Sequence, residues 1–136
     1  MRFDTKIGIA VRGDLAAWQK LNVTAFLASG LGTGAPEVIG QPYQDGSGHR
    51  YLPMFRQPVL VYAASGAQLS GAHRRALERS LSVAVYTEEL FKTGNDDDNR
   101  AAVQAVAADD LNLAGLAVFG RRGEVDRVLK GLSLHK

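Results

Sequence analysis

Short apolar runs alternate with amphipathic segments along the chain. The apolar runs are typical of buried strands, and they cover residues 7–11, 59–63, 83–86 and 113–119. Apolar residues at helical spacing predict helices over residues 15–28, 70–79, 97–107 and 124–132. Strands that alternate with helices favour an α/β fold in which helices cover both faces of one largely buried sheet. We therefore expect a three-layer α/β/α arrangement around a four-stranded mixed sheet.

Polar residues mark where these helices should begin and end. Asp14 stands where an N-cap is expected before the first helix, because a carboxylate accepts the free backbone N–H groups of a first turn. Ser29-Gly30 should end that helix. Ser70 is the expected N-cap of the second helix, and a short helical turn is expected from Thr87 to Phe91.

The segment of residues 36–58 is the least regular part of the chain. It is rich in glycine and proline, and Asp45-Gly46 is a good turn sequence. Loops of this length inside a compact domain are usually functional. We expect a lid or wall over a site, or a pair of strands that covers one.

Composition narrows the possible classes of protein. A chain of 136 residues with 46% hydrophobic and 22% charged residues is typical of one globular domain, so we expect a single domain over residues 1–136. The lack of cysteine excludes disulfides, thiol nucleophiles and thiolate metal sites, and is consistent with the cytoplasm. No apolar run approaches the ~18 residues of a membrane span, so no membrane partner is expected.

Charge is distributed unevenly although the net charge is only +2. Basic residues cluster in two predicted helical regions: His73, Arg74, Arg75 and Arg79, and Arg121, Arg122, Arg127 and Lys130. If these helices lie side by side, they form a modest patch that attracts phosphate groups. The alternative interpretation is an ordinary solvated helix face.

Three other motifs do not support a cofactor or metal site. The glycines of residues 30–34 follow a helix, whereas phosphate-binding loops follow a strand and open a helix. Residues 96–99 lack the alternating ligands, glycine and closing glutamate of a calcium loop. The three histidines are far apart in sequence. We therefore expect neither a metal nor a cofactor.

Two ends of the sequence carry a family resemblance. Residues 6–15, KIGIAVRGDL, and residues 113–134, LAGLAVFGRRGEVDRVLKGLSL, resemble the first and last units of the type 2 peptidyl-tRNA hydrolases. Arg12, Asp14 and Leu15 match that family's first motif, and Lys20 corresponds to its second lysine. The chain is also similar to a small bacterial family of unknown function in VRGDLAAWQKLNVTAFL, QPVLVYAA and YTEELFKTGNDDDNRAAV. Both resemblances imply the hydrolase fold.

The resemblance and the residue types together nominate a site. The Gln-Asp-Ala-Gly-Arg-Thr segment of the hydrolases is replaced by residues 86–94, in which Glu88 takes the place of the aspartate and Thr93 that of the threonine. Ester hydrolysis needs a base for water and donors for the developing oxyanion. Lys20, Glu88 and Thr93 are the candidate catalytic residues. The candidate binding residues are Asp14, Asn22, Thr24 and Asn95.

Two functions from different classes follow from these residues. The first is hydrolysis of an ester or amide bond in a small acyl conjugate, including one carried by tRNA. The second is a non-enzymatic ligand-binding or regulatory module that kept the scaffold and lost the hydrolase residues. The resemblance also implies a homodimer, for which Trp18, Phe55 and Phe91 are candidate aromatic anchors.

Overall fold

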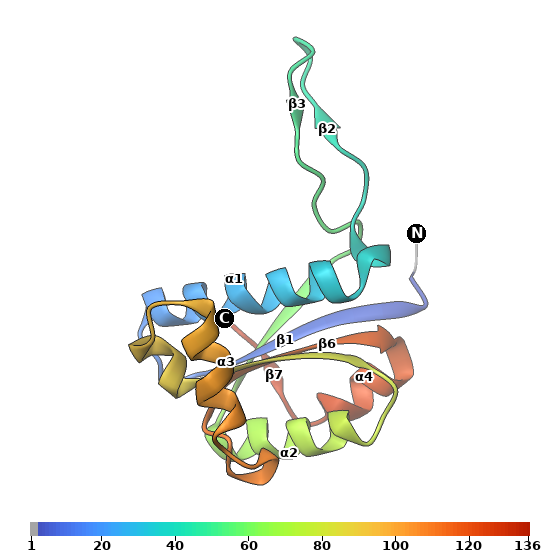
Figure 1. The fold of residues 1–136 in the computed structure, drawn as a ribbon. Helices are drawn as coiled ribbons and strands as arrows, with labels where there is room; N and C mark the ends of the chain where they lie inside the picture. The colour runs from blue at the N-terminus through green and yellow to red at the C-terminus, as the bar shows by residue number, and fades with distance from the viewer. Residues whose placement is uncertain (1–2) are drawn as a thin grey trace.

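The computed structural model describes residues 3–136 and has a five-stranded mixed sheet at its centre (Figure 1). The strands and helices of the body are β1 (Thr5–Arg12), α1 (Ala17–Gly34), β4 (Val59–Ala64), α2 (Gly66–Leu77), β5 (Ser82–Thr87), α3 (Asp96–Gln104), β6 (Leu113–Arg121), α4 (Arg122–Val128) and β7 (Ser133–Leu134). Short 3-10 turns are η1 (Pro36–Val38), η2 (Glu88–Lys92) and η3 (Ala108–Asp110). A separate hairpin consists of β2 (Tyr43–Gln44) and β3 (Arg50–Tyr51).

The strand order in the sheet is β5-β6-β1-β4-β7. β1 is parallel to β4, whereas β6 runs antiparallel to both of its neighbours, β1 and β5. All four expected strands are present, but the expected strand number is wrong, because β7 adds a fifth. Gly131, with φ +87°, turns the chain after α4 so that Leu134 pairs with Tyr62. A two-residue strand has no periodicity of its own, and only its partner β4 makes it a strand.

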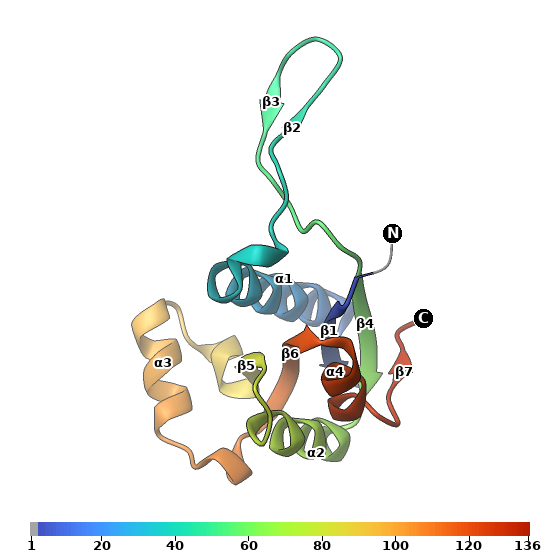
Figure 2. The same ribbon diagram turned by 90° about the vertical axis from the view of Figure 1, so that its right-hand side faces the viewer.

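β1 is buried on both faces because it lies at the centre of the sheet. Ile7, Ile9 and Val11 belong to one apolar cluster, and the alternate residue Ala10 belongs to the other. α1 packs on the first face through Val23, Leu27 and Leu31. α2 and α4 pack on the opposite face (Figure 2). Helices therefore lie on both faces of the sheet.

Both expected boundaries of α1 are wrong. α1 begins at Ala17 after the N-cap residue Ala16, whose backbone N–H donates to the side chain of Gln19, while Asp14 lies outside the helix. α1 also continues past Ser29-Gly30 to Gly34, because buried Leu31 holds this last part against the core. Tertiary packing overrides the glycine stop signal here.

The N-cap of α2 is Ser65 and not Ser70. The Ser65 hydroxyl accepts the backbone N–H of Gln68 at 3.1 Å, and the Gln68 side chain accepts the backbone N–H of Ser65 at 2.8 Å. This reciprocal arrangement is a capping box. Ser70 lies inside the helix. The helix therefore begins directly after β4 and directs its N-terminus at the edge of the sheet.

The segment of residues 36–58 forms an arm that projects far from the body (Figures 1 and 2). Its β2 and β3 strands pair through Tyr43 with Tyr51 and Gln44 with Arg50. Below the hairpin, Ile39 bridges to Phe55 and anchors the arm beside α1. The segment contains a pair of strands, which was one of the expectations. This pair points into solvent, however, and covers neither the sheet nor a site.

Candidate functional site

The ends of β1 and β4 enclose a depression at one edge of the sheet. The two strands are parallel neighbours, and the helices that follow them lie on opposite faces. Open α/β sheets bind ligands at such switch points, because the two chains separate there and leave a crevice. The depression has a volume of about 420 Å³ and is lined by Arg12, Gly13, Asp14, Ala63, Ala64, Ser65, Gly66 and Gln68.

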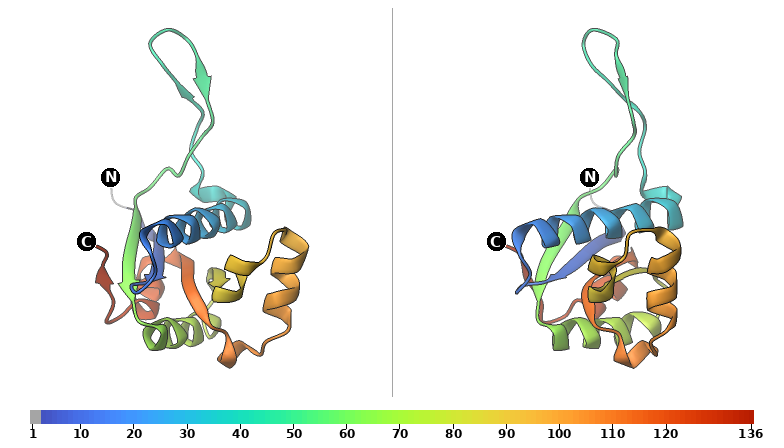
Figure 3. Two further views of the ribbon diagram at one scale, coloured as in Figure 1. Left: turned by 90° about the vertical axis from the view of Figure 1, so that its left-hand side faces the viewer. Right: turned by 60° about the vertical axis from the view of Figure 1, so that its left-hand side comes forward.

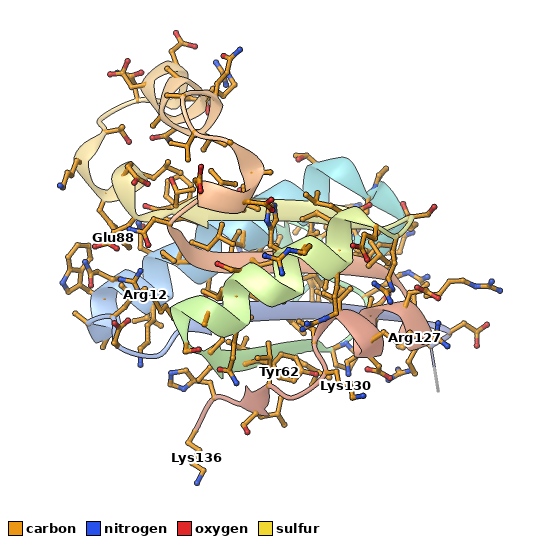
Figure 4. All side chains as sticks on the ribbon, turned by 90° about the horizontal axis from the view of Figure 1, so that it is seen from below. Arg12, Tyr62, Glu88, Arg127, Lys130 and Lys136 are labelled. Atoms are coloured by element: carbon orange, nitrogen blue, oxygen red, sulfur yellow. The ribbon has the colours of Figure 1, made fainter. Side chains whose placement is uncertain are left out.

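Arg12 lies at the centre of a polar cluster beside this depression. Its Nε donates to Asp14 Oδ1 at 2.7 Å, and its Nη1 donates to Glu88 Oε2 at 3.0 Å (Figure 4). Nη1 also lies 3.4 Å from Asn112 Oδ1, and the Asn112 amide donates to Glu88 Oε2 at 2.9 Å. Residues from the ends of β1 and β5 and from the chain before β6 therefore meet at one guanidinium group.

The charges in this cluster stabilise one another. Hydrogen bonding to Arg12 lowers the pKa of Glu88, with the charge of Arg12 and the amide of Asn112 acting in the same direction. Hydrogen bonding to Asp14 is the largest cause that raises the pKa of Arg12. Glu88 is therefore ionised at neutral pH and acts as a hydrogen-bond acceptor. The Asp14 side chain remains 74% exposed, so it is open to a ligand, whereas that of Arg12 is only 15% exposed.

Backbone hydrogen bonds fix the positions of the chain segments around the depression. Gly13 donates its N–H to the carbonyl of Ala64 at 2.9 Å and so ties the ends of β1 and β4 together. The Ser65 and Gln68 capping box then begins α2 at the rim. Because the first turn of a helix has backbone N–H groups without partners inside the helix, this rim favours ligand oxygen atoms.

The structure distributes the expected site residues over three places. Asp14 and Glu88 share Arg12 at the sheet edge. Lys20 and Thr24 line an apolar groove between α1 and the C-terminal segment, where Lys20 Nζ lies 3.2 Å from His135 Nε2. The Thr24 hydroxyl donates to the carbonyl of Lys20 within α1.

Asn22, Thr93 and Asn95 line a third place, the cleft between α1, η2 and the start of α3. The Asn22 amide lies 3.4 Å from the hydroxyl oxygen of Tyr86. The Thr93 hydroxyl donates to the carbonyl of Leu90 and contacts Asn99. Asn95 is the N-cap of α3, since its side chain accepts the N–H of Asp98 at 2.8 Å. No described contact joins Lys20, Glu88 and Thr93.

Arg12 and Asn112 are the site residues that the sequence analysis did not nominate, although Arg12 was part of the family resemblance. Arg12 is the last residue of β1 and Asn112 directly precedes β6, both at the edge where β1, β4 and β5 end. A search of the residues next to each apolar run would have found Arg12. The sequence gives no comparable signal for Asn112. This residue precedes its strand, and it lies at this edge because β6 is antiparallel to β1.

The two basic regions do lie side by side, since α2 contacts α4. Two of their arginines, however, hold the two helices together. Arg75 donates to the carbonyl of Val128 at 2.9 Å, and Arg79 pairs with Glu124 at 3.0 Å. Arg122 donates to the carbonyl of Phe3. Part of this surface is therefore a helix-packing contact.

Two further classes of site were searched for in residues 3–136. No helix of this part of the chain is long and apolar enough to cross a membrane. Within the same residues, no three side chains of histidine, aspartate or glutamate come together as ligands of one metal ion.

The fold and the site define a class: mixed α/β proteins with a polar cluster around an arginine at the edge of the sheet. The chain belongs to the family described as "Protein of unknown function (DUF2000)", whose model matches residues 5–136. A solved structure, the protein of unknown function Atu0240 from Agrobacterium tumefaciens strain C58, is 44% identical and has a TM-score of 0.95. The match covers 99% of this chain and 100% of that one. No curated protein matches the chain.

Proposed function

We propose that the protein is a ligand-binding module whose ligand lies in the depression between β1 and β4. The observation that carries this proposal is the position of Arg12 and Asp14. Both line the depression: Arg12 is the last residue of β1 and Asp14 lies just after it, at the switch point of the sheet. A small ligand placed there can contact two chain segments and the start of a helix at once.

The chemistry of the depression favours a ligand with both donors and acceptors. Asp14 has an exposed carboxylate that can accept N–H or O–H groups. Arg12 uses Nε and Nη1 for hydrogen bonds within residues 3–136, and no side-chain hydrogen bond in that range uses its Nη2. That group and the first turn of α2 can donate to a carbonyl or phosphate oxygen. An acyl conjugate, including one carried by tRNA, has this combination of groups.

The candidate catalytic residues are engaged in contacts of their own. Glu88 accepts from Arg12 and Asn112, and Thr93 donates to the backbone of η2. A carboxylate that is held ionised by an arginine is a weak general base, because its affinity for a proton is reduced. These contacts favour binding over catalysis by Lys20, Glu88 and Thr93 acting together.

Hydrolysis of an ester or amide bond in such a conjugate is the second candidate function. The observation that favours it is that Asp14 and Glu88 lie on either side of Arg12. In this arrangement Asp14, which pairs with Arg12 through Oδ1, orients the attacking water with its other carboxylate oxygen, and Arg12 stabilises the negative charge that develops on the carbonyl oxygen. This version of the hydrolase hypothesis uses neither Lys20 nor Thr93.

We also propose that the fold is the three-layer type 2 peptidyl-tRNA hydrolase fold. Support comes from the crossover helices on opposite faces and from Arg12, Asp14 and Leu15 at the end of β1. The absence of cysteine supports the cytoplasm as the place where the protein works.

One experiment separates the two functions. A fluorescently labelled peptidyl-tRNA and the corresponding uncharged tRNA are titrated with the protein, and release of the acyl group is followed in the same samples over a salt series. Asp14→Asn and Arg12→Gln test the depression, and Arg121→Gln is the matched control because Arg121 is an exposed arginine at the other end of the sheet.

Binding without release that weakens at least tenfold in Arg12→Gln, and not in Arg121→Gln, supports the binding module. Release that is lost in Asp14→Asn supports hydrolysis. Binding that the Arg12 and Asp14 variants leave unchanged contradicts both proposals for the depression. Absence of both binding and release contradicts an acyl conjugate as the ligand.

A further inference from the structure

α1 exposes an apolar surface that one copy of the chain leaves uncovered. Its outward side chains include Trp18, Leu21 and Phe26, and Leu21 is 73% exposed. Lys20 is the only charged residue of this helix from Ala17 to Gly34. Surface helices of globular proteins normally have a charged outer face, and helices that are apolar all round are normally buried. The composition of α1 is therefore that of a helix with a partner on its outer side.

The sheet beneath α1 is also incompletely covered. Five strands spaced by roughly 4.8 Å span about twice the width of one helix. The opposite face has two helices, whereas α1 is the main cover of this one (Figure 2). An apolar groove of about 410 Å³ remains beside α1, lined in part by Leu21, Val61 and His135. A second groove of about 510 Å³ runs along its other side, lined in part by Phe26, Ala84 and Val103.

The β2–β3 arm projects from this same side of the molecule (Figure 3). It carries four exposed large apolar side chains, Tyr43, Tyr51, Leu52 and Met54, and Leu52 is 85% exposed. A two-stranded hairpin is marginally stable alone in water, and side chains of this kind gain free energy when they are buried. Trp18 and Phe26 each touch one aromatic ring of their own chain, Phe91 and Tyr86, but remain at least half exposed. The arm and the face of α1 are thus two largely exposed apolar surfaces on one side of one chain.

We infer that two copies of this chain pair through the outer face of α1, with the β2–β3 arm of each copy packed against the α1 side of the other. A second copy that rests on α1 lies beside the first arm, and a two-fold axis places its own arm beside the first body. This arrangement is closed, so it gives a dimer and not a filament.

The area that this interface would bury and the charge of the α1 face are both consistent with a second copy of the chain as the partner. Seven exposed side chains, three on α1 and four on the arm, bury on the order of 600 Å² per copy if each loses about half of the 150–250 Å² of a large side chain. Specific interfaces bury about 800 Å² per partner, and the small residues of α1 add to the total. Residues near a two-fold axis approach their own copies, so like charges there repel. Because Lys20 is the one charged residue of α1, this face can have at most one such pair, Lys20 with Lys20 of the second copy.

The anchors of this interface differ from the aromatic residues that the sequence favoured. Trp18 is exposed and belongs to the face. Phe55 packs against the core of its own chain, and Phe91 packs on Tyr86 with ring centroids 5.2 Å apart. Leu21 and Leu52 are therefore better tests of the interface than Phe55 or Phe91.

The test is the molar mass in solution, measured by light scattering after gel filtration over a range of concentrations. The wild-type chain should give twice 14.6 kDa. Leu21→Glu, and a variant in which a short glycine-serine turn replaces residues 43–51, should each give monomers with an unchanged circular dichroism spectrum of the body. Leu77→Glu is the matched control, because Leu77 is 58% exposed on α2 at the opposite face, and it should remain a dimer.

The inference is wrong if the wild-type chain is a monomer at about 100 μM, a concentration at which even a weak dimer forms. It is also wrong if the chain is a dimer that Leu77→Glu dissociates and Leu21→Glu does not. A dimer that survives shortening of the arm overturns the role of the arm. Because the chain has no cysteine, Leu52→Cys and Ala25→Cys variants mixed at equal concentration provide a second readout. A thiol cross-link between the two variants supports contact of the arm with α1, and its absence in a confirmed dimer contradicts it.

Discussion

The guanidinium of Arg12 and the carboxylate of Glu88 are 3.0 Å apart although 76 positions separate them in the sequence. The contact joins the end of β1 to the residue after β5, and β6 lies between these two strands. Antiparallel β6 places Asn112, just before its first residue, between the ends of its neighbours, where it donates to Glu88. The ion pair therefore depends on the strand order of the sheet.

Glu88→Gln should reduce the free energy of unfolding at neutral pH by less than about 1 kcal/mol, because the pair is partly exposed and screened by water. The pKa of Glu88 is lowered in the folded protein, so its contribution is present above the unfolded value near 4.5 and is lost as pH falls through the folded value. Urea unfolding at pH 7 and pH 3 should show a smaller difference at pH 3 than at pH 7. Glu89→Gln, at the exposed neighbouring residue, is the control; an equal effect in both variants would contradict a specific contact with Arg12.

Ser65→Ala should destabilise the protein by about 1 kcal/mol, because the N-cap hydroxyl of α2 is lost. Ser70→Ala should have no cost, since Ser70 is inside the helix and alanine is the better helix former. Thermal unfolding of the two variants measures both effects. The reverse order would mean that the helix begins at Ser70, as its sequence suggests.

Gly115→Ala should destabilise the protein by ~1–3 kcal/mol through overpacking. A Cβ at this position of β6 would lie 2.6 Å from Val23 Cγ1 and 3.2 Å from the carbonyl oxygen of Ala10, and neither group can move away freely. Gly123→Ala is the control, because a Cβ at Gly123 in α4 meets nothing within 4 Å. Denaturant unfolding should leave the control at least as stable as the wild type. A tolerated Gly115→Ala would show that α1 can shift away from the sheet.

His73 should make the protein less stable in mild acid. It is a buried residue of α2, and desolvation lowers its pKa below the usual 6.5, partly offset by the charge of Asp109. The unfolded chain therefore takes up the proton first, so the free energy of unfolding falls as pH drops below 6.5. His73→Gln should flatten this dependence in urea unfolding between pH 7.5 and pH 5. His49→Gln, at an exposed histidine of the arm, is the control for the loss of a histidine outside the core.

The location of the four long strands was predictable because the signal is local. Each strand packs against neighbours on both faces, so its residues form a continuous apolar run that no amphipathic helix would have. The α/β class follows from the order of these runs and the helices between them. The charged residues at the start of α3 also follow a local rule, since Asp96, Asp97 and Asp98 lie at its positive end.

Helix boundaries were less predictable because packing competes with local preference. Asp14 has the side chain of an N-cap, yet its carboxylate accepts a hydrogen bond from Arg12 Nε at 2.7 Å. Gly30 has the sequence signal of a helix end, yet α1 continues. Burial of Leu31 stabilises the helix by more free energy than the glycine costs. In both places an interaction formed in the folded chain outweighs the preference of one residue.

The sequence alone determined the class of fold, the four long strands and a set of polar residues that includes Asp14 and Glu88. Tertiary structure decided which of those residues meet: Asp14 and Glu88 share Arg12, while Lys20 and Thr93 lie elsewhere. It also decided that β7 joins the sheet and that the arm points away from the body. The physical reason is that strand runs and helix periods are set by neighbours along the chain. Contacts between strand ends depend on the order and direction in which the whole core packs.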